Sequence, residues 1–477
     1  MRNKTLAGAL GACVLLGAVF TVPLSRAGAA SCEGASRADF NGDGHDDFAV
    51  GDPKASLGDA VSAGQVTVLY GEGRPGKGEP AVLRDGTPQS GAGFGYSIAT
   101  ADLNGDRCLD LVVGSPWADE GTGRAQIFLG SPQGLKPGAV LKPGRATRTF
   151  GWSVTAAGRD GGSPTVVVGA PYETVGGKES AGAVHVFTVG GDGGAALRSV
   201  VDQDSPRAEG VAEAGDLFGW AVKLGRIRGK ADWDLIVSEP GEDVENQAVD
   251  AGSFTVVEDV ATDGQAKGEH WHYGNLGVGA PSPGGNIGWS LAYAEENGTA
   301  YVAVGIPGQT VDGKERAGIV ALLTSVNGQG LKPLRTIPQT LGGKSFVEAG
   351  DRYGWSLALA DGAVTGSGVQ LAVGVPHDGA GDARPENGWV HLVPLSAPDD
   401  ALLIDALNGN VPGDAGAYDH FGWSVAFTTG ALLIGVPDDR EEPCGTLIVR
   451  PLDKRDPVQI RPDSEADETD FGAALAG

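Results

Sequence analysis

The sequence predicts an all-β fold, a seven-bladed β-propeller of four-stranded blades whose ring is closed by the C-terminal strand completing the first blade. Two recurring phrases lead to this prediction. The first is an aromatic or apolar residue followed by glycine, mostly FGWS, and it begins at Phe94, Phe150, Phe218, Ile287, Tyr353, Phe421 and Phe471. The second is mostly Val-Gly-x-Pro, and it ends at Pro53, Pro116, Pro171, Pro240, Pro307, Pro376 and Pro437. Successive prolines stand 55 to 69 residues apart, which marks an internal repeat.

Each repeat contains four predicted strands. One strand starts at the first phrase, as in FGWSVTAAG, and a β-branched run leads into the second phrase, as in TVVVGAP. A third strand alternates after a glycine, as in the segment from Gly182, and a more variable fourth leads to the next repeat. Four-stranded units arranged radially bury their faces against their neighbours, which is the architecture of a propeller.

An aromatic side chain stands directly after the Phe-Gly pair in six repeats: Tyr96, Trp152, Trp220, Trp289, Trp355 and Trp423. We expect these side chains to fill the wedge between neighbouring blades, because one aromatic per repeat in an apolar strand is typical of core packing. A row of aromatics that stacks on carbohydrate is the alternative.

The two series of phrases are out of step. The chain opens with a second phrase that has no partner before it and closes with a first phrase that has none after it, FGAALAG from Phe471 to Gly477. The last strand should therefore complete the blade that begins near Asp39. An open solenoid would instead finish in atypical polar caps at both ends. The sequence accordingly favours a closed ring and a single domain over residues 31–477.

The first thirty residues have the pattern of a secretory signal, with Arg2 and Lys4 ahead of a glycine-interrupted apolar run from Leu6 to Val22 and a small-residue stretch after it. We expect residues 1–30 to be a signal peptide and the protein to be secreted, extracellular or cell-surface associated. A membrane anchor is the alternative, but the run is short and broken. Lipidation at Cys13 is disfavoured because apolar sequence continues beyond it.

The formal charge of −26 argues against nucleic acid and anionic membrane as partners, and it favours cations and basic surfaces. Beyond the expected signal, the chain has three cysteines, Cys32, Cys108 and Cys444. In an oxidising compartment, one disulfide and one remaining thiol is the simplest arrangement. The spacing does not tell which pair forms.

Two loops carry a spacing of acidic and amide residues that favours a divalent cation. The ligand positions are Asp39, Asn41, Asp43, His45 and Asp47 in the first loop and Asp102, Asn104, Asp106, Cys108 and Asp110 in the second. Side-chain oxygens at positions 1, 3, 5 and 9 and a main-chain carbonyl at position 7 suit calcium. His45 and Cys108 would contribute only their carbonyl oxygens, and we expect two calcium ions.

Two other interpretations of these loops are open. An EF-hand needs a bidentate glutamate at position 12, where Val50 and Val113 stand, so that competitor is disfavoured. An Asx-rich turn without metal is the simpler alternative, because Asn-Gly and Asp-Gly also form plain turns. The remaining blades lack the pattern.

Blade four has positive residues at the equivalent place, Arg226, Arg228 and Lys230, ahead of Asp234. We expect this built-in positive charge to replace a bound cation. The serine of Gly-Trp-Ser recurs in several blades, so it is structural and not a nucleophile. The histidines are dispersed and do not form a spaced zinc set.

Three aspartates, Asp216, Asp351 and Asp419, each stand two residues before the first residue of the FG phrase. They could form a ring of carboxylates around the mouth of the central channel. Capping of turns is the favoured alternative, because aspartate commonly accepts hydrogen bonds from nearby backbone amides.

Phe-Gly-x-Ser, the acidic DxNGDGxxD loop and Val-Gly-x-Pro, in this order and at this period, resemble the FG-GAP repeat. That family forms the seven-bladed propeller head of integrin alpha chains and of many secreted bacterial relatives. The resemblance covers essentially the whole chain after residue 30. It implies calcium in the two acidic loops above and a role in extracellular adhesion. Relatives also carry propellers beside phospholipase or polysaccharide-cleaving domains, but we expect no additional catalytic domain in this length.

We therefore expect a secreted, calcium-binding module that binds an extracellular protein or glycan, as a monomer and without membrane insertion. Recognition is expected in the variable loops after the Gly-x-Pro phrases, such as residues 172–181 and 309–317, because polar loops on a rigid scaffold commonly carry binding. An extracellular hydrolase or lyase with a carboxylate site at the central channel is the alternative.

Overall fold

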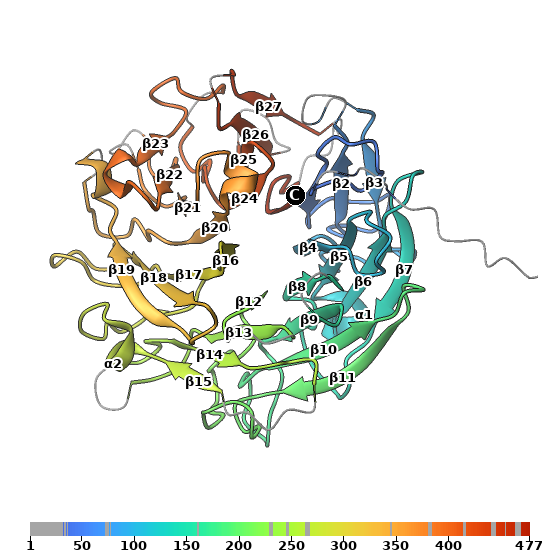
Figure 1. The fold of residues 1–477 in the computed structure, drawn as a ribbon, viewed down its shortest axis with the longest axis horizontal. Coiled ribbons are helices and arrows are strands. Elements are labelled where there is room, and N and C mark those ends of the chain that lie inside the picture. Colours follow the sequence, from blue (N-terminus) through green and yellow to red (C-terminus); the bar gives the residue numbers. More distant parts are fainter. Residues whose placement is uncertain are drawn as a thin grey trace, which may run out of the picture.

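The computed structural model describes residues 32, 35, 37–71, 76, 78–159, 162–228, 232–244, 248–262, 268–343, 346–379, 384–413, 416–439, 445–453, 455–462 and 469–477. The expected signal peptide, Lys230 and Cys444 lie outside these residues. The described strands form seven antiparallel sheets of four strands each, arranged in a ring around a central axis (Figure 1). The predicted seven-bladed propeller is confirmed.

The blades are up-and-down sheets whose first phrase opens the innermost strand. Counted from the inside outwards, the strands of blades one to three are β28 (Ala474–Ala476), β1 (Phe48–Asp52), β2 (Gln65–Leu69) and β3 (Ala81–Leu83); β4 (Ser97–Ala101), β5 (Asp110–Ser115), β6 (Arg124–Leu129) and β7 (Lys136–Leu141); and β8 (Ser153–Ala157), β9 (Thr165–Ala170), β10 (Ala183–Val189) and β11 (Ala195–Val201).

Blades four to seven follow in the same order around the ring. Their strands are β12 (Val222–Gly225), β13 (Asp234–Glu239), β14 (Ser253–Val257) and β15 (Glu269–Trp271); β16 (Leu291–Glu296), β17 (Thr299–Ile306), β18 (Ile319–Val326) and β19 (Lys332–Ile337); β20 (Ser356–Ala360), β21 (Gln370–Val375), β22 (Trp389–Pro394) and β23 (Leu402–Ile404); and β24 (Ser424–Thr428), β25 (Ala431–Val436), β26 (Thr446–Pro451) and β27 (Val458–Ile460). The described helices are single turns: α1 (Ala118–Gly121), α2 (Tyr273–Leu276), α3 (Gly362–Thr365), η2 (Leu341–Gly343) and η3 (Pro398–Asp400).

The second strand of each blade is buried on both faces. In β9, Val166 and Val168 pack toward the second blade, whereas Val167 packs toward the fourth. Because neither face of such a strand contacts solvent, both faces carry apolar residues. This accounts for continuous runs such as TVVVGA. Seven such apolar clusters lie between seven pairs of neighbouring blades and form the core of the ring.

The wedge between blades is filled by the first residue of each FG phrase. These seven side chains, Phe94, Phe150, Phe218, Ile287, Tyr353, Phe421 and Phe471, are at most 4% exposed. The aromatic side chains two positions later are only half-buried. The prediction that Tyr96 and the five repeated tryptophans fill the wedge is therefore wrong, and their actual place is described below.

The two phrases recur because they meet across every blade junction. A Cβ atom on Gly374 of the second phrase would lie 2.0 Å from the carbonyl oxygen of Gly422 in the next FG phrase. The Ser356 hydroxyl donates to the same carbonyl oxygen at 2.8 Å. Blade four has Ala221 in place of the serine and Ser238 in place of the glycine, so the hydroxyl moves to the neighbouring strand. The repeated serine is thus structural, as predicted.

We expect Gly182→Ala to destabilise the domain by roughly 2–4 kcal/mol, because steric overlap adds to the strain of a left-handed backbone. Gly182 has φ +86°, and a Cβ atom there would lie 2.2 Å from the carbonyl oxygen of Phe218. Gly177 is the matched control, since it has the same φ of +86° but open space within 4 Å. Its replacement by alanine should cost only about 1 kcal/mol of backbone strain. If urea unfolding shows that the two variants lose the same free energy of unfolding, this account of the junction is contradicted.

The C-terminal strand closes the ring. β28 pairs antiparallel with β1, with Val50 opposite Leu475, and the described C-terminus lies beside the first blade (Figure 1). Phe471 is fully buried among side chains of β1, β2, β25 and β26. The Asp470 amide donates to Asp52 at 2.9 Å, and Lys54 forms an ion pair with Asp470 at 3.0 Å. The prediction that the last strand completes the first blade is confirmed.

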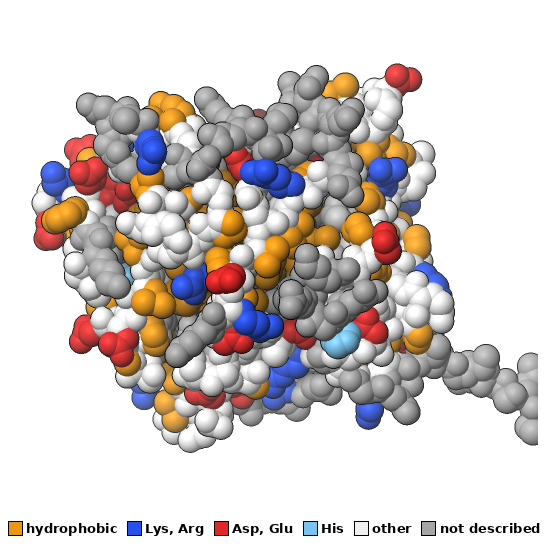
Figure 2. All heavy atoms as spheres, turned by 90° about the horizontal axis from the view of Figure 1, so that it is seen from above, with side chains coloured by type: hydrophobic (Ala, Val, Ile, Leu, Met, Phe, Trp, Pro, Cys, Tyr) orange, Lys and Arg blue, Asp and Glu red, His pale blue; other side chains and the backbone are white. Residues whose placement is uncertain are grey.

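The outer rim carries acidic and basic side chains interspersed with apolar ones on the side drawn in Figure 2. Among the residues that the structure describes, no helix has the length and apolar character needed to cross a membrane.

Candidate functional site: an aromatic upper face and two acidic lower loops

The two candidate binding regions lie at opposite ends of the blades. Inner strands begin at the FG phrase and second strands end at Gly-x-Pro, so antiparallel pairing places both phrases at one end, here called the upper face. Residues 102–110 join β4 to β5, and residues 39–47 lead into β1. Both acidic loops therefore lie at the other end, the lower face, on the first and second blades.

Asx turns wind each acidic loop. The Asp39 carboxylate accepts hydrogen bonds from three amides within the next five residues, and the side chains of Asn41 and Asp43 each accept one from the amide two residues on. The second loop has the same turns, with two amides donated to Asp102 and one each to Asn104 and Asp106. The shared geometry shows that the two sequence patterns fold alike.

The ninth residue of each loop is a fully buried aspartate. Asp47 accepts the amides of Phe40 and Gly71, both at 2.9 Å, and Asp110 makes the equivalent two contacts at 2.8 Å. Burial, together with repulsion from the other loop aspartates, raises the pKa of Asp47 to about 7 and that of Asp110 to about 7. A bound cation would offset both effects.

The donor set of each loop suits a hard divalent cation, because every predicted ligand atom is an oxygen. In the first loop these are the side chains of Asp39, Asn41, Asp43 and Asp47 and the carbonyl group of His45, and the second loop offers the same set. Among the described residues, the loop aspartates are not gathered as three carboxylates within 4.8 Å of one another. Their oxygens instead accept amides of the loop itself, and an ion would draw them together.

Blade four shows what the ninth aspartate does without the other ligands. Asp234 accepts the amides of Ile227, Arg228 and Asp259 at 2.8–3.0 Å, so it fixes the hairpin alone. The Arg228 guanidinium points to Glu258 and Glu269, with contacts of 3.1 and 2.9 Å. The prediction that a built-in positive charge takes the place of the ion is therefore wrong for Arg228.

A disulfide joins Cys32 to Cys108 and so attaches the N-terminal segment to the second acidic loop. The Cys32 amide donates to the Asp106 carbonyl at 3.0 Å, and Leu109 donates to the Asp39 carbonyl at 2.8 Å. The two acidic loops and the disulfide thus form one connected unit. The sequence left this pairing open because three cysteines allow three pairs.

Six aromatic side chains form an arc around the upper mouth of the central channel. Successive ring centroids from Tyr96 through Trp152, Trp220, Trp289 and Trp355 to Trp423 are 4.7–5.2 Å apart. They stand at the start of the inner strands, which surround the axis (Figure 1). Ala473 occupies the seventh position, so the arc is open there. Sequence reasoning found these residues but placed them between the blades.

A hollow of about 370 Å³ lies beside this arc, between blades five and six. Trp289, Trp355, Arg316 and Arg352 line it, and the Arg352 guanidinium lies 5.6 Å from the ring centre of Trp355. Burial, and the charge of the nearby Arg316, lower the pKa of Arg352. Two guanidinium groups are thus concentrated at one spot of a chain whose formal charge is −26.

The three aspartates considered for a catalytic carboxylate ring are turn caps. Asp216, Asp351 and Asp419 are each 3% exposed, and each accepts the backbone amide of the residue three positions earlier at 2.5–2.7 Å. One carboxylate oxygen of each, Oδ2, is taken up by its turn, and all three side chains are buried. The capping alternative holds for all three.

Comparisons with known proteins agree with this architecture. The FG-GAP repeat family matches residues 34–69 and 94–128. Integrin alpha-V of Gallus gallus is 31% identical over 216 residues, which are 43% of this chain and 19% of that protein. Integrin alpha-PS5 of Drosophila melanogaster is 42% identical over 100 residues, which are 20% of this chain and 10% of that protein.

A second group of similar proteins consists of phospholipases rather than integrins. Phosphatidylinositol-glycan-specific phospholipase D of Bos taurus is 33% identical over 168 residues, which are 32% of this chain and 20% of that protein. The chain thus spans a fifth or less of the length of these curated relatives.

Proposed function

We propose that this chain, which is an FG-GAP repeat protein with an integrin-alpha-like propeller, is a secreted monomeric module that binds an extracellular protein through its upper face. Calcium in the two acidic loops would keep the lower face rigid. The propeller would thereby present its upper loops in one arrangement, which limits the conformational entropy lost when a partner docks.

The composition of the upper face carries this proposal. A half-buried arc of tryptophans adjoins a hollow that contains Arg316 and Arg352. Tryptophan, tyrosine and arginine are the residue types that dominate the energetics of protein interfaces, and such residues cluster in partly desolvated pockets. The guanidinium groups favour an acidic group on the partner.

Calcium is supported by the donor set and by the burial of the ninth aspartates. Asp47 and Asp110 are fully buried beside further carboxylates, and a divalent ion would offset the negative charge gathered there. Extracellular placement is supported by the Cys32–Cys108 disulfide, because disulfides persist chiefly in oxidising compartments.

A binding array tests the proposed function. Calcium-loaded protein is screened against extracellular proteins and glycans, and each partner found is measured by surface plasmon resonance. We expect protein partners whose affinity falls at least about tenfold in Arg316→Ala and Arg352→Ala, since truncating a hot-spot arginine costs about 2 kcal/mol or more and about 1.4 kcal/mol is a factor of ten. Arg335→Ala is the matched control, because Arg335 is exposed on the outer strand β19 and should leave binding unchanged.

Two outcomes would overturn the proposal. If the partners bind both upper-face variants as tightly as the unaltered protein, the upper face is not the docking surface. If only glycans are bound, the ligand class is wrong even though the module binds outside the cell.

A further inference from the structure

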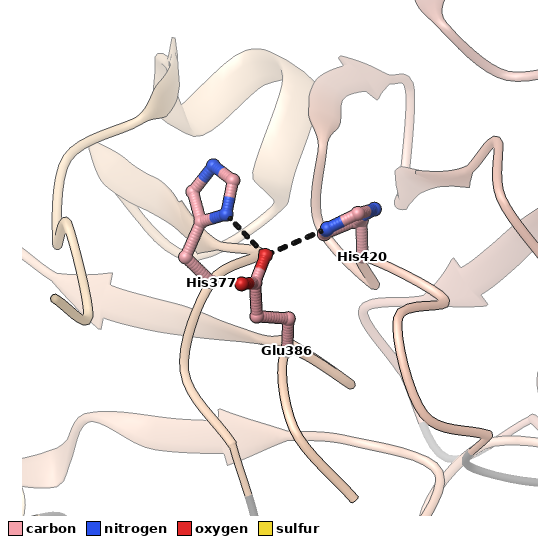
Figure 3. Close-up of side chains that lie close together, drawn as sticks. All are labelled: His377, Glu386 and His420. Atoms are coloured by element: carbon pink, nitrogen blue, oxygen red, sulfur yellow. Dashed lines mark hydrogen bonds and ion pairs between the residues drawn. The ribbon is translucent and has the colours of Figure 1, made fainter.

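Three side chains with metal-binding atoms meet on the upper face at the junction of blades six and seven. His377 and Glu386 belong to the loop that follows the Gly-x-Pro phrase of blade six, and His420 stands directly before the FG phrase of blade seven. Figure 3 shows both imidazole rings pointing at the carboxylate of Glu386. Within the described part of the chain, no other group of three such residues is gathered as closely.

The contacts converge on one oxygen atom. Glu386 Oε2 lies 2.9 Å from His377 Nδ1 and 3.0 Å from His420 Nε2, and the ligand atoms of all three lie within 4.8 Å of one another. In a tetrahedral site with bonds of 2.0–2.1 Å, neighbouring ligand atoms are about 3.3 Å apart. To admit an ion, the two short contacts would open by a few tenths of an ångström, and the two histidine nitrogens, at most 4.8 Å apart, would adjust toward the same spacing.

The ligand chemistry selects a class of metal. Two imidazole nitrogens and one carboxylate oxygen suit zinc and its neighbours among the divalent transition metals. Calcium prefers six or more oxygen ligands, so the acidic loops of the lower face and this cluster would not compete for one ion.

A fourth side chain orients the cluster. Asp438 lies 2.7 Å from His420 Nδ1, and this contact fixes the ring so that Nε2 faces Glu386 at 3.0 Å. An ion would replace the proton that Nε2 shares with Glu386, while Nδ1 keeps its proton toward Asp438. A histidine ligand whose other nitrogen donates to a carboxylate is the usual arrangement in protein metal sites. Asp438 is therefore a positioning residue.

The backbone that carries the cluster is also fixed. The His420 amide donates to the Glu386 carbonyl at 3.2 Å, and the adjacent amide of Phe421 donates to Asn387 at 3.0 Å. The His377 ring packs edge-on against Trp355, with centroids 4.6 Å apart. Ligands held on packed elements of this kind lose little conformational freedom when an ion binds.

The cluster is open to solvent on one side. Side-chain exposure is 40% for Glu386 and 15% for each histidine, and the cluster borders a hollow of about 390 Å³. Arg316 and Arg352 line the same hollow, and Glu315 stands there together with Glu386 as an offsetting charge. An ion can enter from this side, and a water molecule can complete its coordination.

We propose that His377, Glu386 and His420 form a site for a divalent transition metal of the zinc class, with three protein ligands and one position open to water. The ion would join the upper loop of blade six to blade seven at the edge of the aromatic arc. This inference does not depend on the proposed partner binding.

Zinc binding to the tag-free protein, measured by calorimetry with calcium in excess, tests the site. We expect one equivalent that is lost in His377→Ala, His420→Ala and Glu386→Gln. Asp438→Asn should retain the site but weaken it by about 10- to 100-fold, as loss of an outer carboxylate partner does. Two matched controls should bind as the unaltered protein does: Glu315→Gln, which alters an acid in the same hollow, and His272→Ala, which alters a histidine of another blade.

The proposal fails if the unaltered protein binds no zinc, or if every bound equivalent survives in both histidine variants. Thermal melts of each calcium-loaded variant establish that it is folded. The absorption of bound cobalt gives an independent readout in the unaltered protein, because four-coordinate cobalt absorbs visible light far more strongly than the hydrated ion. A cobalt spectrum that is unchanged in His420→Ala would likewise place the metal elsewhere.

Discussion

Deleting residues 471–477 should unfold the entire domain. The deletion removes β28, which pairs with β1, and the fully buried Phe471. Loss of one buried phenylalanine alone costs about 3–5 kcal/mol, and the exposed edge of β1 adds to this. Because a domain is stable by only about 5–15 kcal/mol, we expect the truncated protein to lose its cooperative thermal transition.

Two further experiments test whether this loss comes from the C-terminal strand. Phe471→Ala keeps the strand and should lower stability by about 3–5 kcal/mol while leaving a cooperative transition. A peptide of residues 469–477, added to the truncated protein, should restore part of the transition because it can pair with β1. If the truncated protein unfolds at an unaltered midpoint, the pairing of β28 with β1 does not stabilise the ring.

Removing calcium should give the second-largest loss of stability. An ion that binds only the folded state stabilises it by about 4 kcal/mol when its free concentration is a thousand times the Kd, and the sequence offers two such loops. We therefore expect chelation to lower the melting temperature markedly. When calcium is present, Asp43→Ala and Asp106→Ala should each remove the stabilisation that one bound ion provides.

The effect of each loop variant should shrink in chelator to the smaller cost of the lost Asx-turn hydrogen bond, because no ion is bound there to be lost. Asp234→Ala is a control whose effect should not depend on calcium. Asp234 caps a hairpin in a blade without the acidic loop, so this variant should destabilise the protein equally with and without calcium. The exposed Asp59→Ala should have no effect in either condition. A melt that chelation leaves unchanged would remove calcium from the lower face.

The sequence predicted the ring because its two phrases meet physically at every junction. The close contact between glycines such as Gly374 and Gly422 tolerates almost no side chain, so the requirement recurs once per blade and is visible as a period. The same requirement applies at the junction between the seventh blade and the first, where Gly435 contacts Gly472. Blade number and closure could therefore be predicted from one chain.

The direction of the aromatic side chains could not be predicted in this way. Phe218 and Trp220 are two residues apart, which in a regular strand places them on one face. The intervening Gly219 has φ +92° and breaks that alternation, so Phe218 enters the wedge while Trp220 lies at the channel mouth. Periodicity shows that both positions matter but not where each one points.

Residues that meet only across blades were invisible in the sequence. His377 and His420 belong to different repeats, and neither has a partner at a spacing typical of metal ligands, so their approach to Glu386 depends on the ring itself. The Cys32–Cys108 pairing is of the same kind. By contrast, the acidic loops are local, and their Asx-turn geometry follows from nine consecutive residues.

The aromatic arc also gives the protein an optical property. Its neighbouring rings are 4.7–5.2 Å apart and inclined to one another by 44–52°. Indole chromophores at such separations share their excited states, and a repeated inclination of one kind produces a circular dichroism couplet that a separated blade lacks. Light absorbed by one tryptophan is then delocalised over its neighbours, so ultraviolet spectroscopy can follow the assembly of the inner strands without any added label.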